Sequence, residues 1–121
     1  MKKTATSSIM IYVRDRSREI AKRHLMLLEA YAVTKGLVVE GIFMDIGSAH
    51  DASRPGLMAL NEATEQRNVS TILVMTPEAL FRGKYLDTAL FRQMLFGGVE
   101  IMTPYEKPRS FDETAYPALY K

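Results

Sequence analysis

Short apolar strands alternate with amphipathic helices along most of this chain, and this alternation limits the folds open to it. Four runs are predicted as strands, at 7–13, 37–44, 71–75 and 99–102. Three segments with apolar residues at helical spacing are predicted as helices, starting near Ser17, Arg54-Pro55 and Lys84. Strands separated by helices of about ten or more residues form parallel βαβ units. We therefore expect an α/β domain of three layers with a mostly parallel sheet of about four strands.

Local signals support these boundaries. Ser17 is typical of a helix N-cap, and Lys35-Gly36 of a helix end. Pro55 suits the first turn of a helix, with Ser53 before it as the cap. Two inner helix faces are expected, formed by Leu57, Leu60, Ala63 and Thr64 and by Leu86, Ala89, Leu90 and Met94.

Composition narrows the class of protein. The chain has 121 residues, 47% hydrophobic and 25% charged, which is typical of one soluble globular domain. There are no cysteines, which excludes disulfides and thiolate metal sites, and His24 and His50 have no ligand spacing, so we expect no metal and no cofactor. No apolar run approaches the ~20 residues that span a bilayer, so we expect no membrane contact and a cytoplasmic location. A net charge of +2 permits contact with DNA without requiring it.

Three short charged motifs follow the predicted strands. They are Tyr12-Val13-Arg14 with Arg16, then Asp45 through Ser48 to Arg54, then Pro77-Glu78-Ala79-Leu80-Phe81-Arg82. In order, spacing and placement they resemble the N-terminal catalytic domain of the serine recombinases, the resolvase/invertase family. The resemblance extends over about residues 9–104.

This resemblance implies DNA strand exchange through a serine nucleophile within a cage of arginines, without a metal. Arg14, Arg54 and Arg82 match cage arginines, and Glu78 is a conservative substitute for an aspartate. Asp45 matches the aspartate that ends a strand, and Ser48 matches the serine of the loop after it. The chain departs from the pattern at three positions: Arg16 stands at the nucleophile position, Ala79 replaces a cage arginine, and His24 stands in place of a glutamine. A guanidinium stays protonated and cannot act as the nucleophile.

We therefore expect a degenerate recombinase domain that acts through binding or regulation, or is a remnant of a mobile element. One alternative is an active recombinase fragment that uses Ser17 as its nucleophile, although Ser17 also suits a helix cap. Another is a phosphate- or anion-binding regulator, whose site would comprise Arg14, Arg16, Ser48, Arg54 and Arg82. Without the resemblance, Arg14 and Arg54 would be read as surface partners of Asp45, Asp51 or Glu78.

The sequence also suggests how the chain is organised. Residues 1–104 are expected to form the domain and residues 105–121, with two prolines, an arm or tail. We expect no DNA-binding module in this chain, so its binding to DNA alone should be weak. A second copy or a recombinase is the expected partner. Apolar residues from Leu86 to Phe96 should either mediate this association or be covered by Phe111, Tyr116, Leu119 and Tyr120 of the tail.

Overall fold

A four-stranded parallel sheet forms the centre of the domain, as predicted. The computed structural model describes residues 8–51, 53–67, 69 and 71–104. The sheet has the order β2 (Val38–Ile46), β1 (Ser8–Asp15), β3 (Thr71–Leu73), β6 (Glu100–Met102), and each neighbouring pair is parallel. The predicted tail at 105–121, and with it the boundary of the domain, lies outside the described residues.

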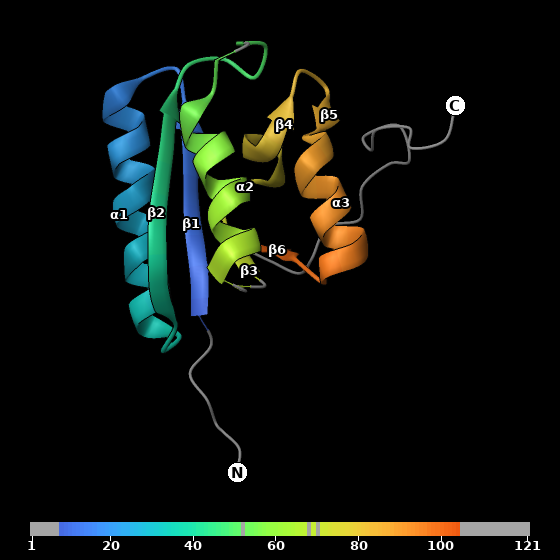
Figure 1. Cartoon of the computed structure of the whole chain (residues 1–121). Helices are drawn as coiled ribbons and strands as arrows, with labels where there is room; N and C mark the ends of the chain where they lie inside the picture. Colours follow the sequence, from blue (N-terminus) through green and yellow to red (C-terminus); the bar gives the residue numbers. More distant parts are fainter. Residues whose placement is uncertain (1–7, 52, 68, 70, 105–121) are drawn as a thin grey trace.

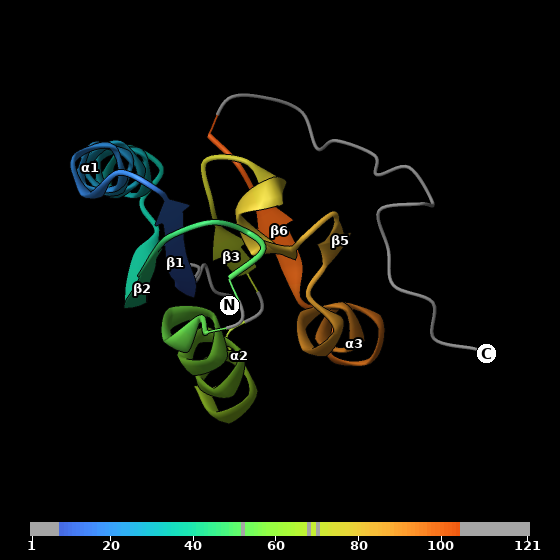
Figure 2. The ribbon, with the colours of Figure 1, turned by 90° about the horizontal axis from the view of Figure 1, so that it is seen from above.

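Helices cover both faces of this sheet, so the expected three layers are present (Figure 1, Figure 2). Helix α1 (Arg18–Thr34) lies on one face, and α2 (Pro55–Arg67) and α3 (Thr88–Gly97) lie on the other. Each face has its own apolar cluster, one beneath α1 and one beneath α2 and α3. Residues 9–13 of β1 are buried on both faces, which explains why this central strand is a continuous apolar run.

The ends of α1 follow the predicted signals. The Ser17 hydroxyl accepts a hydrogen bond from the backbone N–H of Ile20 at 3.2 Å, so Ser17 is the N-cap. Gly36, just past the helix, has φ of 69°, a left-handed conformation that glycine adopts without strain. In α2 the predicted inner residues Leu57, Leu60 and Thr64 are buried.

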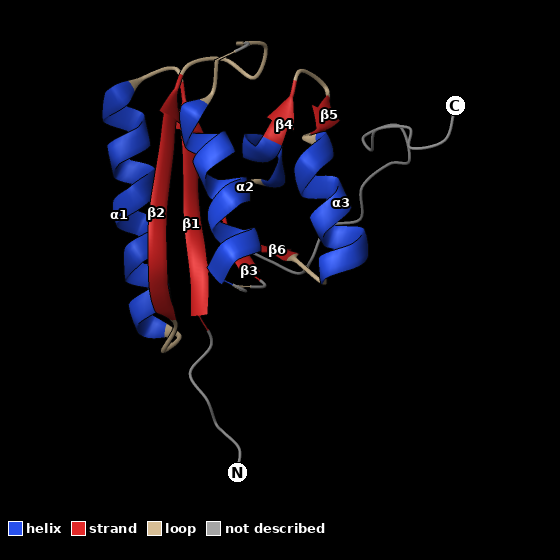
Figure 3. Ribbon diagram, viewed as in Figure 1, coloured by secondary structure: helices blue, strands red, loops and turns tan. Residues whose placement is uncertain are grey.

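The predicted start of the third helix is wrong. Residues 84–87 are not helical: a 3₁₀ helix, η1 (Pro77–Leu80), leads into an antiparallel hairpin of β4 (Phe81–Arg82) and β5 (Tyr85–Leu86) (Figure 3). Gly83 turns the hairpin with φ of 66°, and the Asp87 carboxylate accepts from Leu90 N, which starts α3 at Thr88. The later start leaves Ala89 exposed rather than inward.

Candidate functional site

A buried polar cluster joins the ends of the strands to α2. The Tyr12 hydroxyl on β1 donates a 2.6 Å hydrogen bond to Asp45 Oδ2 on β2, and it accepts one of 2.8 Å from Arg54 Nη2. Arg54 is 1% exposed, Asp45 7% and Tyr12 0%. Arg54 Nε lies 3.8 Å from Asp45 Oδ2, too far for a hydrogen bond but close enough to offset the buried charge. We call Tyr12, Asp45 and Arg54 the buried triad.

Arg54 also holds the segment that carries the third motif. Its Nη2 donates to the carbonyl of Ala79 at 2.8 Å, and its Nη1 donates to the carbonyl of Phe81. Both η nitrogens are therefore bound to the protein itself. In this arrangement an anion reaches Arg54 only if Tyr12 or β4 moves, so anion binding by Arg54 stays a prediction.

The Asp45 carboxylate also binds the N-terminus of α2. Its Oδ1 accepts from Gly56 N at 2.7 Å and its Oδ2 from Leu57 N at 2.8 Å. These are N–H groups of the first turn, which have no partner within the helix and carry its partial positive charge. A carboxylate from β2 thus caps α2, and the predicted cap, Ser53, is exposed.

The surroundings of Tyr12 suppress its ionisation. Burial, and then the hydrogen bond donated to Asp45, raise the pKa of the Tyr12 phenol well above its ordinary value of 10.0, although Arg54 acts in the opposite direction. The neutral phenol is therefore the form that the fold retains in alkaline solution.

We expect Tyr12 to be missing from the ordinary tyrosine titration. The chain has six tyrosines. Over roughly pH 9 to 11, where free phenols ionise, the near-ultraviolet phenolate absorbance of Tyr12→Phe should match that of the parent protein. The parent should gain its last phenolate only as it unfolds. A loss of one sixth of the amplitude in the variant would contradict the raised pKa.

Arg14 and Ser48 lie beside the triad at the same end of the sheet. Arg14 is half-buried; its Nη1 donates to the carbonyl of Gly47 at 3.1 Å, and its buried Nε has no partner among the described residues. The Ser48 hydroxyl accepts from His50 N, and Asp51 Oδ2 accepts from Ser48 N. Ser48 thus helps to close its own loop.

Arg82 lies on the hairpin near this loop. Its Nε donates to Asp87 Oδ1 at 2.5 Å, and its side chain is 36% exposed. The N–H of Gly83 donates to the carbonyl of Ala49, which ties the hairpin to the loop. Glu78 is exposed on η1, whereas Ala79 is 7% exposed and packs in the core.

Arg16 and Ser17 occupy the turn between β1 and α1. Arg16 is exposed and makes no hydrogen bond or ion pair with the described residues. The backbone N–H of Ser17 donates to Asp15 Oδ2 at 2.8 Å, while its hydroxyl caps α1. The reading of Ser17 as a helix cap is confirmed.

The chain folds so that all three motifs meet at the carboxyl edge of the sheet, where open α/β sheets bind ligands. Sequence reasoning missed the roles of Tyr12 and Asp87. Tyr12 is part of the first motif, but nothing in the sequence indicated a role for it. Asp87 follows the β4–β5 hairpin, and the sequence pattern predicted a helix in place of that hairpin. Among the described residues no group of acidic or histidine side chains is arranged to hold a metal ion, and no helix is long and apolar enough to cross a membrane.

Solved structures of similar fold are serine recombinase domains and a transposon protein. The C-terminal catalytic domain of ISC1926 TnpA, an IS607-like serine recombinase, is 28% identical with a TM-score of 0.67, over 85% of this chain and 71% of that one. The first open reading frame of transposon ISC1904 from Sulfolobus solfataricus P2 is 18% identical, with a TM-score of 0.62 over 87% and 72%. The N-terminal catalytic domain of TP901-1 integrase is 20% identical, with a TM-score of 0.60 over 80% and 76%.

No protein-family model and no curated protein matches the sequence. Two of these structures are catalytic domains from opposite ends of their proteins, C-terminal in ISC1926 TnpA and N-terminal in TP901-1 integrase. What they share with this chain is the overall fold, with TM-scores from 0.60 to 0.67. The chain therefore has the fold of a serine recombinase catalytic domain.

Proposed function

We propose that this domain binds the phosphate groups of DNA at the carboxyl edge of its sheet and does not cut them. The observation that carries the proposal is the exposed Arg16, which stands where the resemblance places the nucleophile and has no partner among the described residues. A guanidinium is a strong donor to phosphate oxygens but cannot attack phosphorus. The substitution removes the nucleophile and adds positive charge at the same place.

The remaining residues of the motifs fit binding better than cleavage. Arg14 and Arg82 are partly exposed and would supply further charge, although Asp87 neutralises part of that on Arg82. Arg54 would act as a positioning residue, because its donors hold Tyr12 and two carbonyls. Ser17 is the only rival nucleophile that the sequence suggested, and capping α1 already uses its hydroxyl.

Few phosphate contacts imply weak binding with a modest dependence on salt. Each neutralised phosphate contributes a slope of roughly −0.9 to log K against log salt. Two or three arginines therefore give a shallow slope, in keeping with the expectation that this chain alone binds DNA weakly. A second copy or a recombinase bound to the same DNA would strengthen the binding. We also propose that the domain is a remnant of a mobile element or regulates one.

The test combines a binding assay with a search for a covalent product. Fluorescence anisotropy with labelled duplex DNA at low salt should show binding that Arg16→Ala weakens several-fold, with a salt slope smaller by about one. Glu65→Ala, on the exposed face of α2, is the matched control and should not weaken binding. Mass spectrometry of the same mixtures should detect no protein joined to DNA.

Three outcomes would decide against the proposal. A serine-linked DNA adduct that disappears in Ser17→Ala would establish the alternative, an active recombinase fragment. Equal affinity of Arg16→Ala and the parent would place DNA binding elsewhere. If inorganic phosphate but not DNA binds with the same dependence on Arg16, the site is that of an anion-binding regulator.

A further inference from the structure

Strand β2 is a long open edge of the sheet. It pairs with β1 on one side, and no other strand of the described residues pairs with its opposite side. An edge strand of nine residues presents a row of backbone groups that can receive another strand. Edges are usually protected by lysine or proline, yet the exposed charge on β2 is Glu40 alone, which accepts from the Ser8 hydroxyl at 3.2 Å.

Exposed apolar side chains line this edge. Ile42 is 42% exposed and Ile46 37%. Both lie on the face of the sheet that α1 covers, because Ile42 pairs with Ile11, which packs beneath α1. Beside them on α1, Met26 is 67% exposed and Val33 80%. From the sequence, exposed apolar residues were expected only near α3, where Leu95 and Phe96 are exposed, so this second surface is a finding of the structure. We call Ile42, Ile46, Met26 and Val33 the β2 flank.

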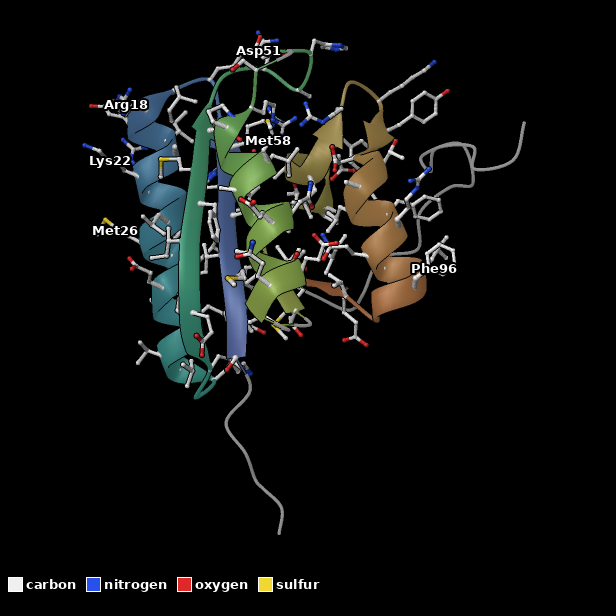
Figure 4. The ribbon with its side chains drawn as sticks, in the orientation of Figure 1. Arg18, Lys22, Met26, Asp51, Met58 and Phe96 are labelled. Atoms are coloured by element: carbon white, nitrogen blue, oxygen red, sulfur yellow. The ribbon has the colours of Figure 1, made fainter. Side chains whose placement is uncertain are left out.

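The outer side of α1 has charges that would complement those on the same side of α1 in a second copy. Arg18, Lys22, Met26, Glu29 and Val33 recur at three- and four-residue spacing and thus share one side of the helix. Figure 4 shows Arg18, Lys22 and Met26 on the outer side of α1. Lys22 and Glu29 lie on either side of the central Met26. In an antiparallel pair of α1 helices, each Lys22 would therefore meet the Glu29 of the other copy.

The spacing between the sheet and its helices allows two copies to pair through β2 and through α1 at the same time. Helix α1 packs against both β1 and β2. With strands about 4.8 Å apart, a helix above the midline of that pair would lie about 10 Å from its symmetry mate, a normal helix-packing distance. Met26 lies about 12 Å from the end of α1. Ile42 lies about 10 Å from the start of β2, because a β-bulge takes up one residue of this strand. The two are therefore level, so one twofold axis can pass near both.

We propose that two copies of this chain associate through the β2 flank, with β2 strands antiparallel and α1 helices side by side. The sheet would continue from one copy into the other, and the interface would be isologous, the commonest symmetry of protein dimers. Apolar burial at Met26, Val33 and Ile42 would drive the association. The pairs between Lys22 and Glu29 would set its register.

Sedimentation equilibrium of the full chain at up to roughly 100 µM, where a weak dimer is populated, tests this proposal. We expect a reversible dimer. Ile42→Lys should raise its dissociation constant by about tenfold or more, because it places a charge on the edge. Phe96→Lys, on the 79% exposed side chain of α3, is the matched control and should leave the constant within about twofold.

Charge reversal tests the register. Lys22→Glu alone should weaken the dimer about tenfold by opposing like charges, and Lys22→Glu with Glu29→Lys should restore it to within about threefold. The chain lacks cysteine, so Met26→Cys should form an oxidised dimer across the twofold axis. A monomer at every concentration would overturn the proposal. So would a dimer broken by Phe96→Lys but not by Ile42→Lys, which would place the interface on α3.

Discussion

Asp45→Ala is expected to destabilise the domain by about 3–5 kcal/mol, the range found when one partner of a buried charge pair is removed. The substitution leaves the Arg54 guanidinium buried without a counterion and the Tyr12 hydroxyl without its acceptor. It also uncaps the first turn of α2, because Gly56 N and Leu57 N both bind the same carboxylate. Urea unfolding followed by circular dichroism measures the loss.

Two further variants identify the cause. Asp45→Asn keeps an oxygen that can accept from α2 but removes the charge, so its loss should be smaller than that of Asp45→Ala. Glu62→Ala removes an exposed carboxylate of α2 and should change the free energy of unfolding by no more than about 0.5 kcal/mol. Equal stability of Asp45→Ala and the parent would mean that the buried triad does not hold the fold together.

Most helices and strands could be predicted from the sequence, because their apolar periodicity and end signals involve residues close together in the chain. Residues 9–13 form an apolar run that fits a strand buried on both faces, and the helix signals at Ser17 and Gly36 act within a few residues of their positions. The hairpin at 81–86 was not readable in this way. Its turn depends on Gly83, and the helix after it depends on Asp87, which accepts from Asn61, 26 residues earlier.

The role of Arg54 shows the same limit at the candidate site. The family resemblance indicated that Arg54 is a phosphate ligand, whereas the residues alone favoured pairing with an acidic side chain such as Asp45. The partners of Arg54 in the fold are the carbonyls of Ala79 and Phe81, which lie 25 and 27 residues further along the chain. Every residue has a backbone carbonyl, so the sequence does not indicate which carbonyls accept from Arg54, and its burial could not be inferred. That the three motifs meet at the carboxyl edge of the sheet was predictable, whereas the burial of Arg54 among them was not.

Gly56→Ala is the second substitution for which we expect a large effect, a loss of about 3 kcal/mol. In an ordinary helix this change adds about 1 kcal/mol of stability, because alanine has the higher helix propensity. Here the new methyl carbon would lie 2.5 Å from the carbonyl oxygen of Met44 and 2.8 Å from its carbon. Both are backbone atoms of β2 and cannot turn aside, so the start of α2 must move away and its hydrogen bonds to Asp45 must lengthen.

Gly97→Ala at the end of α3 is the matched control. A methyl group there meets no heavy atom within 4 Å, so this variant should be neutral or more stable by up to about 1 kcal/mol. Thermal and urea unfolding of both variants would compare the same chemical change in two helices. Opposite signs are expected, since only Gly56 lies against a strand. A stabilised Gly56→Ala would show that α2 can separate from β2 without loss, and the close contact between Asp45 and α2 would then not be essential to the fold.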